Sequence, residues 1–408
     1  MKALQPFFIP ALWIGVVAML GLGGCGTPPR KAVGLMDTPQ HHTRIGHKFI
    51  EKGQWKAAGE SFDLAIGLGK AHGPAYAGKA IVVAHGATAR GLGADQREAL
   101  FEQAGDLVEQ ALDNAETPEE KRAAHVAGIR VQRMTKVERK WLAEAEEHYE
   151  DAVDLDKRRL DPDPHFYMAR AYRDAFEVRK AEDSYRKVLG MNSSKTGMAN
   201  AELALVQKVI RAEPGSRHGR VIAFAPTISR ADIAALFIEE LRLERLYRRG
   251  NAKRSDTGFK PPAQAGKFEA DKVVRAAEVT DIGNHPLRAD ILAVIRLRVA
   301  GLQPDARHRF HPDKPLRRAQ FAMMVQDILI KVTGEEGLAT KFVGQTSPFP
   351  DVRGNHFSFN AIQTVTSRGW MEPLDKFNGN FGPEKPVHGA DALLAIRLLN
   401  NQLRRYVQ

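Results

Sequence analysis

The hydrophobic positions between residue 41 and about residue 195 follow a helical spacing in which small residues alternate with larger ones. Small side chains let two antiparallel helices approach closely, and the larger side chain fills the gap to the next pair. The phrase A-x-x-x-(F/Y/V)-x-x-(A/V) occurs four times: Ala58, Phe62 and Ala65; Ala104, Val108 and Ala111; Ala145, Tyr149 and Ala152; and Ala181, Tyr185 and Val188. The pattern predicts stacked helix pairs, with Tyr149 and Tyr185 in the core rather than in a ligand site.

The first and last of these units resemble the tetratricopeptide repeat. The first unit has that family's residues at Gly46, Phe49, Gly53, Trp55, Ala58, Phe62 and Ala65. The last unit, Met168 to Val188, matches at Ala169, Tyr172, Ala181 and Tyr185, while the two middle units are irregular. The resemblance implies a helical solenoid over residues 41–195, whose concave face would bind peptides or a partner protein.

From about residue 197 the pattern changes to three copies of a longer phrase. Each copy has F-x-P, a short polar stretch and the start of an apolar helix. The copies begin at Phe224, Phe310 and Phe381, and their helix starts are Ser229–Asp232, Arg317–Gln320 and His388–Asp391. An earlier helix precedes each phrase, over about 200–212, 287–300 and 359–367, and the last two follow Thr280-Asp281-Ile282 and Phe349-Pro350-Asp351-Val352. A unit this small cannot bury its apolar face alone, so we expect the copies to pack together.

These copies are similar to the S-layer homology (SLH) domain, whose pattern runs F-x-D-V, helix, G, F-x-P, T-R-A-E, helix. The similarity implies a pseudo-trimer of helices within residues 197–408, with repeats at about 197–246, 278–331 and 347–400. In that family, grooves between the repeats bind peptidoglycan or an acidic cell-wall polymer.

The arginine of the T-R-A-E phrase is a recurrent glycan contact in the SLH family, which assigns that role here to Arg230 and Arg318. A guanidinium suits an acidic sugar because its fork pairs with a carboxylate through two parallel hydrogen bonds. The residues alone leave a second reading open, in which both arginines form ion pairs at helix starts or lie on a solvated surface. The third copy has Gly389 at this position, so at most two grooves are expected to be competent.

The N-terminus reads as an export signal that ends in a lipidation site. A positive residue, Lys2, precedes an apolar run from Phe7 to Leu22, and Leu22-Gly23-Gly24-Cys25 resembles a lipobox. The resemblance implies a signal peptide at 1–24, acylation of Cys25 and a Pro-containing tether at 25–40. Gly26 follows the cysteine where an aspartate would mark inner-membrane retention, so we expect an outer-membrane lipoprotein facing the periplasm.

The charge balance favours an anionic partner. The 408 residues contain 60 Lys and Arg against 49 Asp and Glu, a net charge of +11, which favours nucleic acid, anionic lipid or an acidic wall polymer. We do not expect nucleic acid to be the partner, because an exported protein rarely meets it. The basic segment Arg248 to Lys267, rich in Pro and Gly, is expected to form a loop.

No pattern in the chain points to catalysis or to a cofactor. His41, His42 and His47 have no acid or cysteine at a ligand spacing, which favours a solvated tether over a metal site. No nucleophile elbow, P-loop or dinucleotide fingerprint occurs. We therefore expect a protein that is not an enzyme and has no cofactor, anchored by lipid, gripping wall glycan and recruiting a protein partner. The alternative is an outer-membrane assembly or secretion accessory lipoprotein whose helical repeats bind client proteins.

Overall fold

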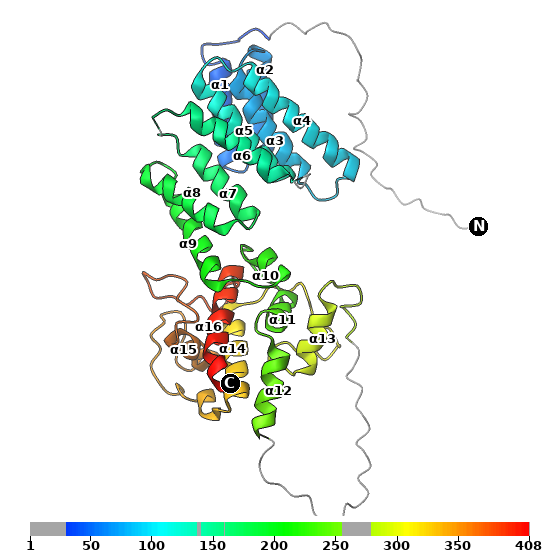
Figure 1. Ribbon diagram of the computed structural model, residues 1–408, viewed down its shortest axis with the longest axis vertical. Helices are drawn as coiled ribbons and strands as arrows, with labels where there is room; N and C mark the ends of the chain where they lie inside the picture. The colour runs from blue at the N-terminus through cyan, green and yellow to red at the C-terminus, as the bar shows by residue number, and fades with distance from the viewer. Residues whose placement is uncertain (1–29, 137–139, 159, 255–278, 408) are drawn as a thin grey trace, which may run out of the picture. The chain divides into compact units, whose positions relative to one another are not determined.

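The computed structural model describes residues 30–136, 140–158, 160–254 and 279–407, and every regular element in those ranges is a helix (Figure 1). This result confirms the all-α class. The chain forms two compact units, unit one (Met1–Ala127) and unit two (Gly128–Gln408). The division lies within helix α5 (Pro118–Thr135), whereas the repeat patterns predict a domain boundary near residue 196.

Unit one is built from consecutive helices that pack against their neighbours. They are α1 (Pro39–Glu51), α2 (Trp55–Leu68), α3 (Gly73–Ala87) and α4 (Ala94–Asp113), and the unit also contains the first part of α5. The ring of Phe62 is fully buried and lies where two glycines leave room for it. A Cβ atom at Gly46 would lie 2.6 Å from that ring, and one at Gly78 would lie 2.2 Å from it. The glycine and the aromatic residue of the repeat phrase therefore fit each other in space.

Helix α1 begins earlier than the sequence pattern suggests. Thr38 caps α1 by accepting a hydrogen bond from the backbone N–H of His41, so the helix begins at Pro39. His41, His42 and His47 consequently belong to α1, and their assignment to a solvated tether was wrong. His42 Nε2 lies 2.8 Å from Asp37 Oδ1, an acid that the spacing argument did not connect with it.

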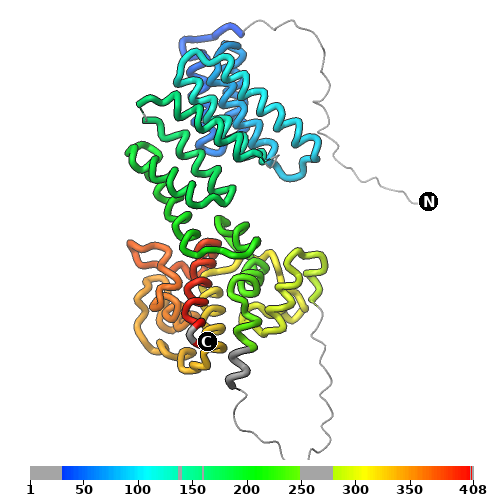
Figure 2. Tube along the Cα trace, in the orientation of Figure 1, coloured from blue at the N-terminus to red at the C-terminus, as the bar shows by residue number. Residues whose placement is uncertain are grey.

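The first part of unit two continues the pairing of neighbouring helices, which turn back on one another along the chain (Figure 2). Its helices are α6 (Trp141–Leu155), α7 (Asp163–Asp174), α8 (Val178–Gly190) and α9 (Thr196–Ala212). Tyr185 is fully buried between them, which confirms the core role predicted for it. Helix α9 packs against both α8 and α16 (Gly389–Val407), so the two repeat regions are continuous within unit two.

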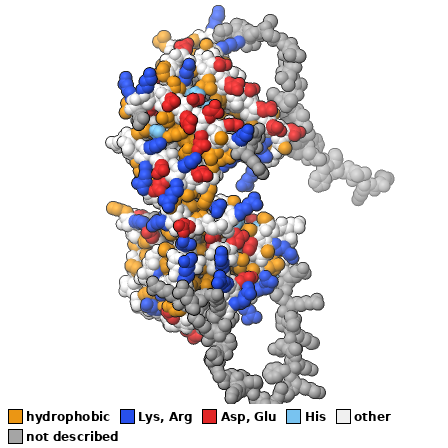
Figure 3. All heavy atoms as spheres, viewed as in Figure 1, with side chains coloured by type: hydrophobic (Ala, Val, Ile, Leu, Met, Phe, Trp, Pro, Cys, Tyr) orange, Lys and Arg blue, Asp and Glu red, His pale blue; other side chains and the backbone are white. Residues whose placement is uncertain are grey.

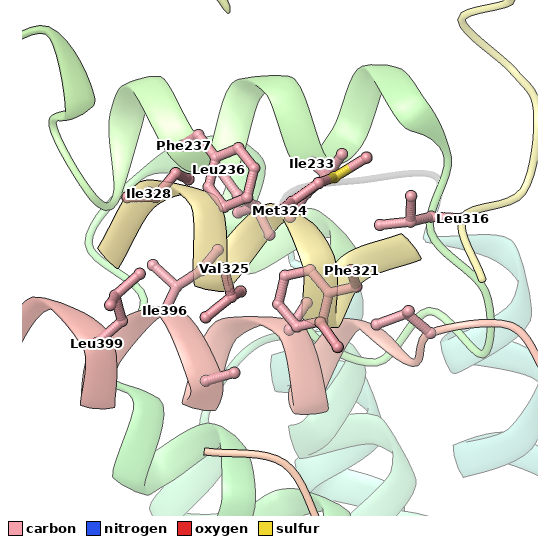
Figure 4. Packing of buried hydrophobic residues seen from close by; sticks show 14 of the residues in the cluster. Ile233, Leu236, Phe237, Leu316, Phe321, Met324, Val325, Ile328, Ile396 and Leu399 are labelled. Carbon is pink, nitrogen blue, oxygen red and sulfur yellow. The ribbon is translucent and has the colours of Figure 1, made fainter. Parts of the chain in front are cut away.

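The rest of unit two is organised around three helices that share one hydrophobic core. These are α11 (Arg230–Glu239), α14 (Arg318–Thr333) and α16. Their starts confirm the three helix starts predicted from the repeated phrase. Figure 4 shows side chains from all three meeting, among them Phe237 of α11, Phe321 of α14 and Ile396 of α16.

Shorter elements surround this core. They are α10 (Arg217–Ile222), α12 (Leu243–Arg254), α13 (Arg288–Arg296), the 3-10 helix η1 (Glu336–Ala339) and α15 (Phe359–Ser367). The loop expected from residue 248 was wrong in its first part, because α12 continues to Arg254. The remainder of that segment lies outside the described residues.

A closed ring of three backbone hydrogen bonds joins the chain just ahead of the three core helices. The N–H of Leu316 donates to Ile228 O (2.9 Å), that of Val387 to Leu316 O (2.9 Å), and that of Ile228 to Val387 O (3.1 Å). Each of the three residues therefore donates once and accepts once. No single helix start can shift without breaking two of these bonds.

A second set of bonds joins the same three copies with donor and acceptor in the opposite order, and at the third position it leaves no room for a side chain. The backbone N–H of the first residue in each core helix donates to the loop that comes before another core helix. Arg230 donates to Lys314 O, Arg318 to Lys385 O and Gly389 to Ala225 O. An ideal Cβ at Gly389 would lie 1.8 Å from Ile222 O. The third copy has glycine because the backbone of the first copy occupies the space of a side chain.

We expect Gly389→Ala to lower the free energy of unfolding by about 3 kcal/mol or more, because backbone must move to admit the methyl group. Urea denaturation of the variant beside Gly283→Ala measures this difference. A Cβ at Gly283 has nothing within 4 Å, so that control is expected to be near neutral. Equal stability of the two variants would contradict the tight contact at Gly389.

Candidate functional site

The two arginines singled out by the SLH resemblance join one repeat to the next. Arg230 donates from Nε to Phe310 O (2.8 Å) and from Nη1 to Gly301 O (2.6 Å). Arg318 donates from Nε to Phe381 O (2.9 Å) and from Nη2 to Glu372 O (2.5 Å). Each guanidinium also lies over the ring of the phenylalanine whose carbonyl it binds. The distance to the ring centre is 4.8 Å for Arg230 and 4.6 Å for Arg318. The F-x-P loop of each following repeat is therefore held by the arginine of the repeat before it.

Burial separates the two arginines. Arg318 is only 3% exposed, whereas Arg230 is half-buried, and burial lowers the pKa of both guanidinium groups. Arg230 already donates three hydrogen bonds to carbonyl oxygens, including one from Nη2 to Gln303 O (3.3 Å), and Arg318 donates two. An acidic sugar would have to use the N–H groups that remain, so the glycan-contact role of Arg230 and Arg318 stays a prediction.

Two carboxylates hold the same loops from the other side. Asp281 accepts hydrogen bonds from the backbone N–H groups of Phe310 (2.8 Å) and His311 (2.7 Å). Asp351 accepts from Phe381 (2.9 Å) and Gly382 (2.7 Å). Sequence reasoning assigned no role to these carboxylates, although the F-x-D-V phrase contains Asp351. Each of the two loops is thus fixed through its N–H groups and through its carbonyl.

Arg318 also lines a cavity of about 260 Å³ between α9, the segment 369–376 and α16. Its apolar lining comes from Trp370, Met371, Pro373, Leu374, Leu394 and Leu398. Its charged lining comprises Lys208, Arg211, Arg318, Lys376, Arg397, Glu372 and Asp391. Five cations face two carboxylates, so this cavity, which we call the Arg318 groove, carries three excess positive charges.

The carboxylates of the Arg318 groove are already paired. Lys208 Nζ lies 2.7 Å from Asp391 Oδ1, and Lys376 Nζ lies 2.8 Å from Glu372 Oε2. The hydrogen bond from Lys376 lowers the pKa of Glu372, with smaller contributions from Lys208 and Arg211. Arg397 pairs with Glu213, outside the groove lining. Arg211 is exposed and forms no ion pair within the described part of the chain.

A larger cavity of about 540 Å³ lies elsewhere in unit two, and its charges nearly balance. Four arginines and three glutamates line it: Arg242, Arg245, Arg397 and Arg404, with Glu213, Glu239 and Glu240. Glu240 accepts from the backbone N–H groups of Gly215 (3.1 Å) and Ser216 (2.7 Å), so its carboxylate fixes a turn. The Arg318 groove is the better anion site, because its positive excess is larger in a smaller space.

The lining of the groove is both basic and apolar, a composition that suits a ring-shaped ligand with a carboxylate. On the face shown in Figure 3, Lys and Arg side chains are scattered over the region of α14 and α16. Among the described residues, no group of three His, Cys, Asp or Glu side chains could hold a metal ion. Lys208 and Arg211 were not foreseen from the sequence, because they come from the helix that precedes the first F-x-P phrase.

The predicted lipidation site, Cys25, lies outside the described residues, as does the whole signal sequence. Within the described ranges, no helix is both long enough and apolar enough to cross a membrane. No protein-family model matches the chain, and comparisons with curated proteins and with solved structures gave no significant match.

We expect Arg318→Ala to lower the free energy of unfolding by about 3 kcal/mol, because it leaves two inward-facing carbonyl groups without donors and opens a cavity. Arg230→Ala is expected to cost about 1–2 kcal/mol, because water can reach part of its site. Urea denaturation, with Arg179→Ala on the exposed side of α8 as control, checks both values. An Arg318→Ala protein as stable as the control would contradict the role of Arg318 in joining the two repeats.

Stability is expected to depend on pH through His388, whose Nδ1 accepts a hydrogen bond from the N–H of Ala390 at the start of α16 (3.2 Å). Burial lowers the pKa of His388 below 6.5; Asp391 opposes this shift and Lys208 adds to it. Below about pH 6.5, His388 therefore binds a proton more readily in the unfolded state than in the folded state. The free energy of unfolding consequently falls as pH drops below about 6.5.

The variant His388→Asn isolates this contribution, because asparagine can still cap the helix but does not titrate. Unfolding free energies at pH 7.5 and at pH 5.5 should differ less for the variant than for the parent. An equal difference in both proteins would rule His388 out as the titrating group.

Proposed function

We propose that this chain is a lipid-anchored envelope protein that binds cell-wall glycan, either peptidoglycan or an acidic secondary polymer, through its C-terminal repeats. The helical repeats before them recruit a protein partner, and the role is binding rather than catalysis. The observation that carries the proposal is the Arg318 groove, a basic and partly apolar cavity beside a joint between two copies of the F-x-P phrase.

An SLH-like pseudo-trimer is supported by the cyclic bonding of the three copies. The ring through Ile228, Leu316 and Val387 relates the copies to one another in a closed order. At both arginine joints, Nε of Arg230 or Arg318 donates to the phenylalanine carbonyl of the copy that follows. Repeated contacts of this kind are expected where each unit lacks a core of its own.

A tetratricopeptide-like solenoid is supported by the helix pairs of both units. Neighbouring helices pack in chain order from α1 to α4 and from α6 to α9, and the repeat residues Phe62 and Tyr185 are both fully buried. Such stacks present long surfaces to partner proteins.

The lipid anchor rests on Cys25 and the apolar run before it. Acyl chains at one end and wall binding at the other would act in series. Two linked weak attachments bind far more tightly than either alone when the tether spans both sites. This arrangement would place the protein at the inner face of the outer membrane.

The test is co-sedimentation with insoluble wall sacculi, before and after acid stripping of attached polymers, using the chain from residue 25 with Cys25→Ser. The pair Arg211→Gln and Lys376→Gln removes two groove cations that hold no joint, and we expect it to weaken binding about tenfold. The pair Arg179→Gln and Arg186→Gln makes the same change of charge on α8, where both side chains are exposed, and should not change binding.

Loss of binding on stripping would identify an acidic secondary polymer as the ligand, whereas retained binding would identify peptidoglycan. Failure to bind either preparation would overturn the wall-binding role. The accessory role, in which client binding by the helical repeats is the main function, would then be the better account.

A further inference from the structure

Unit two carries a second basic surface, on the helical repeats and away from the Arg318 groove residues. Six cations and three carboxylates from α5, α7 and the adjoining start of α9 form it. The cations are Arg130, Arg133, Lys136, Arg170, Arg173 and Lys195, and the carboxylates are Asp163, Asp174 and Glu202. We call this set the α5–α7–α9 face.

The carboxylates of this face are shared among the cations. Glu202 Oε1 accepts from Arg170 Nε (2.9 Å), and Glu202 Oε2 accepts from Arg173 Nη1 (2.9 Å). Asp174 accepts from Arg133 Nε (2.9 Å), and also from Arg173 Nη2 (2.9 Å). Six cations against these three carboxylates leave three excess positive charges, or two when Asp161, whose Oδ1 accepts from the N–H of Asp163 (2.9 Å), is counted.

Aromatic rings separate the cations at one end of the face. The guanidinium of Arg130 lies 4.5 Å from the centre of the Tyr167 ring, and that of Arg170 lies 4.4 Å from the centre of the Phe166 ring. The ammonium of Lys195 lies 5.1 Å and 5.3 Å from these two rings. Ring faces hold the cations in place without neutralising their charge.

Most of these cations are partly buried, whereas Lys136 is 42% exposed. The side chains of Arg133, Arg173 and Lys195 are 24%, 20% and 17% exposed. Burial lowers the pKa of Arg130, and the nearby cations Arg170 and Arg133 act in the same direction. Positive charge that is partly withdrawn from water and only half neutralised favours an anionic ligand that completes the pairing.

The arrangement favours separated negative charges over a dense polyanion. Asp163, Asp174 and Glu202 stand among the cations, so a continuous phosphate backbone would meet carboxylates along its path. An extended peptide offers a side chain about every 3.3 Å, on alternating sides, and can place carboxylates only where cations lie. Its apolar atoms can rest on the ring of Tyr167.

We propose that the α5–α7–α9 face binds an extended acidic segment of a partner protein. The inference rests on the partner-recruiting part of the proposed function and gives that partner its chemistry. It does not depend on wall binding.

The experiment measures fluorescence anisotropy of a dye-labelled peptide of alternating Glu and Ser, titrated at low salt with the chain from residue 25 carrying Cys25→Ser. A peptide of alternating Gln and Ser is the ligand control. We expect the Glu peptide to bind and the Gln peptide not to bind, and the Glu peptide's affinity to fall as salt rises.

Two variants change the face in opposite directions. The pair Arg130→Gln and Arg133→Gln is expected to weaken binding of the Glu peptide about tenfold. Glu202→Gln should strengthen binding of the Glu peptide several-fold, because the substitution removes the charge that pairs with Arg170 and Arg173 and hardly changes the shape of the side chain. Loss of folding cannot produce a gain in affinity, so the second variant keeps the test valid if the first is less stable. The α8 pair Arg179→Gln and Arg186→Gln should leave affinity within about twofold of the parent.

The proposal is overturned if the Glu peptide fails to bind, if the Gln peptide binds equally well, or if the α8 pair has the same effect as the Arg130 and Arg133 pair. It is also overturned if a single-stranded oligonucleotide, but not the peptide, binds with this dependence on the variants.

Sacculus binding by the Arg130 and Arg133 variant separates the two proposals. If sacculus binding persists while the peptide fails to bind, only the peptide proposal is lost. Peptide binding without sacculus binding would refute only wall attachment.

Discussion

The C-terminal half of unit two depends on the way each F-x-P loop is held by its neighbours. At two of the three joints, an arginine from the preceding repeat donates to the loop's carbonyl and an aspartate accepts from its N–H groups. The phenylalanine ring is thereby fixed in the core, and the helix after the loop starts at a defined place. Without these joints the three short units would each expose an apolar face, because none is large enough to bury its own.

This constraint divides the basic residues of the region into two kinds. Arg318 is nearly inaccessible and its hydrogen bonds stay within the chain, so its main contribution is to the shape of the groove. Arg211 lines the groove and forms no ion pair among the described residues, whereas Lys208 and Lys376 each pair with a carboxylate of the groove lining. The SLH resemblance points to Arg318, but the unpaired positive charge of the groove lining comes from Arg211. A basic composition alone would not have separated the two kinds.

What could be predicted from the sequence follows the range of the interactions involved. Helix starts were predictable because their capping groups lie within three residues, as in Ser229 with Asp232. The aspartates at 281 and 351 went unassigned because the N–H groups they accept from lie about thirty residues further along. The basic wall of the groove was missed because the pattern placed the helix at 200–212 in the first copy but could not show that this helix packs on α16 of the third copy. The extent of α1 and α12 was misjudged where Pro, Gly and charged residues suggested loops, although local capping and packing support helix.

The missing arginine of the third copy can be understood in the same physical terms. The first copy has five residues from Phe224 to Ile228, whereas the other two have seven from phenylalanine to the matching ring residue, Leu316 or Val387. In the third joint, the backbone of Ile222, just ahead of this shorter loop, occupies the place of a side chain, and only glycine at 389 leaves room for it. The start of α16 can then sit against this backbone, and Asp391 reaches Lys208 of α9 at 2.7 Å. An arginine at 389 would push the two apart and remove Asp391 from the groove wall. The apparent degeneracy of the third copy is therefore a requirement of the contact that ties the helical repeats to the C-terminal core.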